Sequence, residues 1–186
     1  MSKAFLPLAL LLAVAACGPQ PPQVTASLPA DAILGAGDPL RSAAANTSVV
    51  FGAPQQLAGR PAEAARAVAQ MEYLAVQIPD NPRFPGISPT AGSQFAAARR
   101  EWRGALGIPA EQPPQAVIES LYAASRALQA GQRDAAAAAL PANVFPQGGQ
   151  TTLLRLASLP RLPLTNDAAV TASQTLQRSE ANRGRF

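Results

Sequence analysis

Hydrophobic residues recur along most of the chain at spacings of three and four, the period of an α-helix that buries one face. The spacing begins after Asp38, where aspartate suits an N-cap and Pro39 suits the first helical position. Apolar residues then follow the helical period to Phe51. The stretch Thr47–Phe51 contains β-branched residues and is open to interpretation as a strand. The spacing of the whole segment favours a helix.

Three further segments repeat this design of a proline-led start, an apolar stripe and a proline or glycine stop. They predict helices at 61–78, at about 90–106 and at about 114–128. The loop 79–89, which joins the first two of these helices, contains four prolines. We expect Phe84 to reach from this loop back into the core.

The C-terminal third contains shorter apolar segments. An alanine-rich helix is expected at 133–140, and a strongly apolar helix at about 150–159. Asn166 or Asp167 is expected to cap a last helix that passes through Leu176. The pattern as a whole predicts an all-α fold, a single helical bundle of about six or seven helices joined by proline- and glycine-rich loops.

The N-terminus has the layout of an export signal. Lys3 is followed by an apolar run at 4–16, which is shorter than the roughly 20 residues of a membrane span. The run ends in Val14-Ala15-Ala16-Cys17. This order of an aliphatic residue, two small residues and a cysteine resembles the lipobox of bacterial lipoproteins. The resemblance implies that the Cys17 thiol receives a diacylglycerol, that cleavage falls between Ala16 and Cys17, and that the new amino terminus is acylated.

The resemblance also implies a location. Gly18 stands where an aspartate would favour retention in the inner membrane, so we expect a lipid anchor in the outer membrane, facing the periplasm. Acylation by two or more chains anchors a protein stably. The alternative is an ordinary secreted protein with a chance cysteine.

Four regions follow from these patterns: a signal peptide at 1–16, a lipidated cysteine with a proline-rich tether at 17–37, a helical domain at 38–180 and a flexible C-terminus at 181–186. A dozen residues of proline-rich chain can span up to about 37 Å. We therefore expect the tether to hold the domain away from the lipid surface.

Composition excludes several kinds of chemistry. The chain has no histidine, and its single cysteine is Cys17. These absences exclude a Ser-His-Asp triad, a Cys-His pair and a histidine-ligated metal site, so we expect no catalytic residues, no metal and no cofactor. Without residues 1–16 the chain holds 14 arginines against 11 acidic residues. This slight excess predicts no binding to nucleic acid.

Arg99, Arg100 and Arg103 lie within one and a half turns of one predicted helix and are candidates for an anion-binding site. Guanidinium groups bind phosphate or carboxylate through paired hydrogen bonds. The alternative is a solvated helix face on which Glu101 relieves the repulsion. Trp102 lies on the apolar side of the same helix and is expected to pack in the core.

The remaining candidates are tyrosines and glutamates. Tyr73 and Tyr122 are expected to pack their rings inward. Two facing carboxylates could perform acid–base catalysis, but most of the helical glutamates fit exposed faces. The glutamates in question are Glu63, Glu72, Glu101, Glu111 and Glu119.

Three functions remain open. The first is a non-enzymatic, lipid-anchored structural or interaction module with a protein partner in the envelope. The second is a domain that binds a small anionic ligand or a peptide. The third is an enzyme based on carboxylates, and it has the least support from the sequence.

Overall fold

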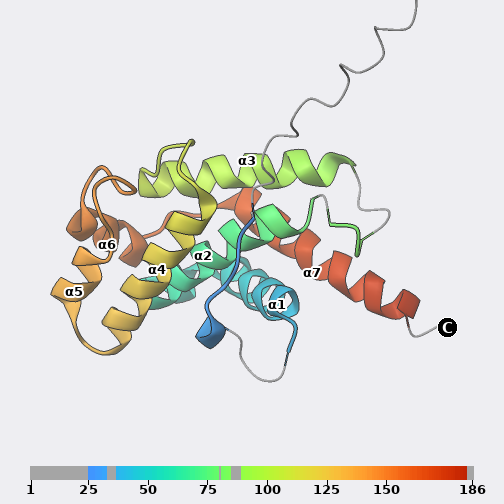
Figure 1. Ribbon diagram of the computed structural model, residues 1–186, viewed down its shortest axis with the longest axis horizontal. Helices are drawn as coiled ribbons and strands as arrows, with labels where there is room; N and C mark the ends of the chain where they lie inside the picture. The colour runs from blue at the N-terminus through green and yellow to red at the C-terminus, as the bar shows by residue number, and fades with distance from the viewer. Residues whose placement is uncertain (1–24, 33–36, 80, 85–88, 184–186) are drawn as a thin grey trace, which may run out of the picture.

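The computed structural model describes residues 25–32, 37–79, 81–84 and 89–183 (Figure 1). In these ranges the regular elements are seven α-helices and two short 3-10 helices, with no strand, so the predicted all-α fold is confirmed. The α-helices are α1 (Pro39–Gly52), α2 (Pro61–Gln77), α3 (Pro89–Leu106), α4 (Pro114–Gln129), α5 (Arg133–Ala138), α6 (Gly149–Ala157) and α7 (Pro163–Arg183). The 3-10 helices are η1 (Ala30–Ala32) and η2 (Pro54–Leu57).

The helix starts follow local rules. Proline opens α1, α2 and α4, where its missing N–H group costs no hydrogen bond. The Asp38 side chain caps α1 by accepting a hydrogen bond from the Leu40 amide at 3.0 Å. Thr47 lies inside α1, and its hydroxyl donates to the Ala43 carbonyl at 2.8 Å. The helical interpretation of Thr47–Phe51 is therefore confirmed.

Helix α2 is the centre of the bundle. Its most extensive contact is with α4, and it also contacts α1, α3 and α6 (Figure 1). Every residue from 67 to 74 is buried. Helix α2 is therefore buried on all sides over these two turns, while both of its ends are partly exposed.

Helices α1 and α7 pack as an antiparallel pair. An ion pair between Arg41 and Glu180 joins the start of α1 to the end of α7. Gly52, at the end of α1, lies near the Asn166 side chain in the first turns of α7. The predicted position of Phe84 is also confirmed, since its ring is buried in the core.

The start of α7 differs from the prediction. The helix begins at Pro163, one turn before the expected caps Asn166 and Asp167. The reason is tertiary. The Glu101 carboxylate, from α3, accepts hydrogen bonds from the amides of Leu164 at 3.2 Å and Thr165 at 2.7 Å. A carboxylate from another helix thus takes the place of a local cap. The far end of α7 runs to Arg183 and so enters the predicted flexible C-terminus.

Part of the predicted tether packs against the helices. Residues 25–32 lie along α2 and α4, and the side chains of Ala26 and Ala32 are buried. The packed part of the chain therefore begins before Asp38, where the sequence placed its boundary. Residues 1–24, including Cys17, lie outside the described residues. Within the described ranges, no helix combines the length and apolar character needed to cross a membrane.

Candidate functional site

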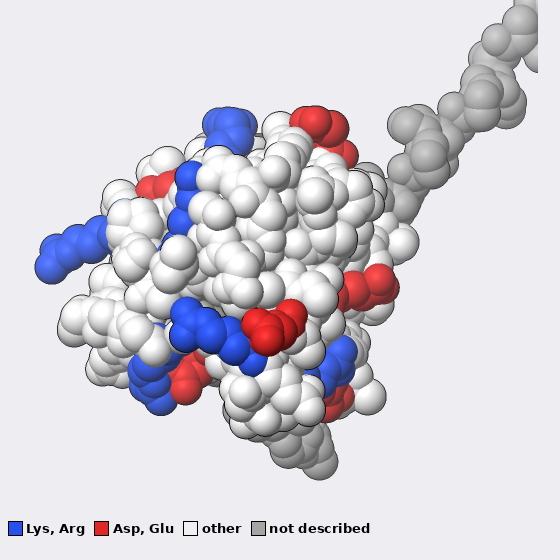
Figure 2. All heavy atoms as spheres, turned by 90° about the vertical axis from the view of Figure 1, so that its left-hand side faces the viewer, with Lys and Arg blue, Asp and Glu red and all other residues white. Residues whose placement is uncertain are grey.

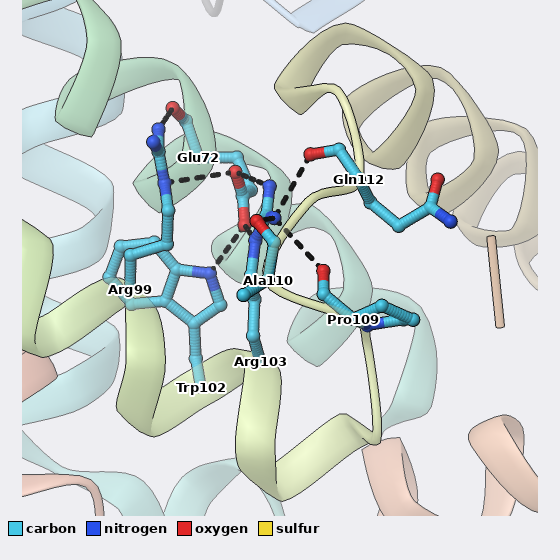
Figure 3. Close-up of polar contacts among 7 residues, drawn as sticks. All are labelled: Glu72, Arg99, Trp102, Arg103, Pro109, Ala110 and Gln112. Atoms are coloured by element: carbon cyan, nitrogen blue, oxygen red, sulfur yellow. Dashed lines mark hydrogen bonds and ion pairs between the residues drawn. The ribbon is translucent and has the colours of Figure 1, made fainter.

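Four side chains meet between α2 and α3 (Figure 3). Glu72 comes from α2, and Arg99, Trp102 and Arg103 come from α3. The Glu72 side chain is fully buried. A buried carboxylate requires charge compensation and hydrogen bonds, because its loss of hydration is costly. We call this group the Glu72 cluster.

Arg103 is the main partner of the carboxylate. Its Nε atom donates to Glu72 Oε1 at 2.7 Å, and one terminal nitrogen donates to Oε2 at 2.9 Å. This is the two-pronged geometry that suits a planar guanidinium group and a carboxylate. The Arg103 side chain is only 3% exposed. The pair is therefore shielded from solvent.

The remaining terminal nitrogen of Arg103 binds the loop between α3 and α4. It donates to the carbonyl oxygens of Pro109, Ala110 and Gln112, at 3.2, 2.8 and 3.0 Å (Figure 3). All three guanidinium nitrogens of Arg103 are thus engaged with protein atoms. Arg103 connects α2, α3 and the entry to α4.

Trp102 also contacts the Glu72 carboxylate. Its indole N–H donates to Glu72 Oε1 at 2.8 Å, and its ring is fully buried. The prediction that Trp102 packs in the core is confirmed. The indole N–H also stabilises the cluster, because it supplies one of the hydrogen bonds that the buried carboxylate needs.

Arg99 lies at the edge of the cluster. Its Nε atom is 3.3 Å from Glu72 Oε2, and a terminal nitrogen donates to the Glu72 backbone oxygen at 3.3 Å. Its side chain is 25% exposed. Burial lowers the pKa of Arg99, the Glu72 carboxylate opposes that shift, and Arg103 adds to it. Two guanidinium groups share one carboxylate, so the cluster carries one net positive charge.

The three arginines do not assemble into the predicted anion-binding site. Arg103 is buried and fully occupied, Arg99 is paired with Glu72, and Arg100 lies exposed on α3. The physical reason is that the cluster already contains its anion, the side chain of Glu72. The alternative of a solvated face is also wrong for Arg103. It holds for Arg100.

The predicted exposure of the glutamates is wrong for Glu72 and incomplete for Glu101. Glu72 is the centre of the buried cluster, and Glu101 caps α7. The other three lie at the surface: Glu63 pairs with Arg60, Glu119 accepts a hydrogen bond from Gln115, and Glu111 is exposed. Among the described residues, no group of three or more acidic, histidine or cysteine side chains could hold a metal ion.

Both tyrosines are buried, as expected. Burial raises the pKa of Tyr122 to about 12, with a partial offset from the neighbouring Gln70 side chain. Burial also raises the pKa of Tyr73. Neither phenol is therefore poised to ionise near neutral pH.

One feature of the sequence did indicate that Glu72 is buried, although the helical spacing alone suggested an exposed position. Glu72 is the only charged residue between Arg66 and Asp80. A single charge in a long apolar, alanine-rich helix is more consistent with a buried, compensated group than with a solvated face. Comparison with known proteins adds no assignment, because no family model, curated protein or solved structure matches the chain.

Proposed function

We propose that the protein is a lipid-anchored component of a bacterial cell envelope, with a non-enzymatic helical domain that serves as a structural or interaction module. The observation behind this proposal is the single cysteine, Cys17, at the end of the signal-like apolar run. Gly18 favours the outer membrane, facing the periplasm. The proposed membrane contact is made by acyl chains on Cys17 and the new amino terminus.

The Glu72 cluster supports a structural role for the charged residues that first suggested ligand binding. Glu72 and Arg103 neutralise one another in the interior, and Trp102 completes the arrangement. In the alternative, in which the domain binds a small anionic ligand, Arg103 is not available to the ligand. Only the half-buried Arg99 and the exposed Arg100 remain for such a site. It is therefore the weaker proposal.

A protein partner fits the composition of one end of the bundle. No charged residue occurs from 135 to 154, the stretch that forms most of α5 and α6 and their connecting loop. Figure 2 views the molecule from this side, where charged side chains of both signs are scattered among wide uncharged areas. Leu154 is exposed there. Low charge is typical of the centre of protein interfaces.

The test of the proposal is the chemistry of Cys17. The wild-type protein should be recovered with membranes, and its intact mass should show removal of residues 1–16 and addition of acyl chains. Cys17→Ser should abolish the added mass and leave the signal uncleaved at that position. A wild-type protein with an unmodified Cys17 would refute lipid anchoring.

A further inference from the structure

Residues 25–32, which are extended chain followed by the short helix η1, lie across the helical bundle; we call this segment the strap. Gln77 Nε2, at the end of α2, donates to the Ala26 carbonyl at 2.7 Å. Gln115 Oε1, at the start of α4, accepts from the Ser27 amide at 2.9 Å. Further along α4, Arg126 binds both carboxylate oxygens of Asp31, at 3.0 and 3.1 Å. Among the described residues, three side chains of α2 and α4 therefore hold the strap by polar contacts.

These attachments are weak compared with the packing inside the bundle. The fully buried side chains of the strap are those of Ala26 and Ala32, which remove little apolar surface from water, and Leu28 is only partly buried. The side chains of Asp31 and Arg126 are each about half exposed, and an ion pair in that setting contributes little. The strap can thus open locally while the helices stay folded.

We propose that the strap is an attachment that can be released, which we call the mooring, and that it sets the distance between the domain and the bilayer. This inference rests on the proposed lipid anchor at Cys17. Thr25 is the eighth residue after Cys17, so with the strap docked the anchor lies within about 25 Å of the domain, at about 3.1 Å per residue. Asp38 is the twenty-first residue after Cys17, so release of the strap extends this reach to about 65 Å.

The docked strap also orients the domain. Thr25, the first described residue of the strap, precedes Ala26 and Ser27, which bind Gln77 at the end of α2 and Gln115 at the start of α4. A short connection from this point directs that end of the bundle towards the lipid surface. Release would let the domain rotate and reach partners farther from the membrane.

The native tryptophan offers a direct readout. Trp102, on α3, is the only tryptophan in the chain; its ring is fully buried, and its indole N–H donates to Glu72. The lipidated protein is reconstituted in phosphatidylcholine vesicles that contain a dansyl-labelled lipid, and energy transfer from Trp102 to the dansyl group is measured. Amide exchange at Ser27 is followed in the same vesicles.

Two sets of variants release the strap. Asp31→Arg reverses the charge of one partner in the ion pair with Arg126. Gln77→Ala with Gln115→Ala removes the side-chain hydrogen bonds to Ala26 and Ser27. Each should reduce energy transfer and abolish the exchange protection of the Ser27 amide. Adding Arg126→Asp to Asp31→Arg restores an ion pair of opposite polarity and should recover both signals.

Matched controls make the same changes elsewhere. Glu180→Arg reverses a surface ion pair of α1 and α7, and Gln55→Ala with Gln150→Ala removes two exposed amides. These controls should leave energy transfer at the wild-type value. If the controls reduce transfer as much as the strap variants do, the effect is general and the proposal is wrong.

The experiments distinguish an error in the proposed mooring from an error in the proposed lipid anchor. Vesicle flotation measures anchoring alone, and a wild-type protein that does not float overturns the lipid anchor together with the mooring. A protein that floats, but whose energy transfer and Ser27 exchange are unchanged by both sets of strap variants, overturns the mooring and leaves the anchor intact.

Discussion

Glu72 of α2 and Arg103 of α3 form a buried pair with two parallel hydrogen bonds of 2.7 and 2.9 Å. Because Arg103 also donates to three carbonyl oxygens of the next loop, this pair joins the central helix to the path of the chain into α4. The pair fixes how the helices are placed relative to one another.

Replacement of Glu72 by glutamine should destabilise the domain strongly. The change leaves the guanidinium groups of Arg99 and Arg103 in the interior without a compensating charge, and breaking a buried pair in this way costs about 3–5 kcal/mol. Urea denaturation followed by circular dichroism measures the loss. Arg100→Ala, which removes an exposed arginine of the same helix, is the control and should change the free energy of unfolding little.

Trp102→Ala should also lower stability, by about 3–5 kcal/mol, because it removes a fully buried ring. Trp102→Phe keeps most of the buried surface and loses the hydrogen bond to Glu72, so its cost should be smaller. Thermal melts followed by circular dichroism compare the two variants without relying on tryptophan fluorescence. An unchanged melting temperature for Trp102→Ala would contradict the core position.

Glu101→Ala should destabilise α7 by about 1 kcal/mol, since it removes the acceptor for the first amides of that helix. Glu101→Gln keeps an acceptor and should cost less. Thr165 donates its hydroxyl to the same carboxylate at 2.6 Å, so Thr165→Val and Glu101→Ala should show non-additive effects in a double-mutant cycle. Additive effects would argue against the tertiary cap. Glu111→Ala, at an exposed position, is the control.

Gly149→Ala should destabilise the contact between α5 and α6. A Cβ atom at position 149 would lie 1.9 Å from the backbone oxygen of Ala137, so the two helices would have to separate. Overpacking of this kind costs about 1–3 kcal/mol. Gly104→Ala is the matched control: a Cβ atom there meets no neighbour in helix α3, and the change should stabilise the protein by about 0.5–1 kcal/mol. Equal effects of the two substitutions would contradict the close approach.

Asp38 should make stability depend on acidic pH. Partial burial alone would raise the pKa of Asp38, but the Arg83 ion pair and the Leu40 amide outweigh it and hold the pKa below its ordinary value of 3.8. The contribution of the ionised group is therefore complete above pH 3.8 and is lost as pH falls through the folded-state pKa.

Asp38→Asn tests this pH dependence, since asparagine caps helices as well as aspartate does but carries no charge. Wild type should exceed this variant in stability at neutral pH, and the difference should vanish in strong acid. A difference that stays constant across that range would show that the charge of Asp38 does not contribute. Denaturation titrations at a series of pH values supply the comparison.

The helices themselves could be predicted from the sequence because their signals are local. Proline at the first position, aspartate at an N-cap and apolar residues at helical spacing act within a few residues of one another, so they identified α1, α2, α3 and α4 closely. The start of α7 could not be predicted this way. Its cap, Glu101, is more than sixty residues away along the chain.

In the candidate site, too, some features follow from the sequence alone and others from tertiary contacts. The sequence by itself determined the all-helical fold, the inward position of Trp102 and the absence of histidine chemistry, because these follow from periodicity and composition. Only the tertiary structure decided that Glu72 lies in the core and meets Arg99 and Arg103. Whether a charge is solvated or compensated depends on which helices surround it, and the central position of α2 is a property of the whole bundle.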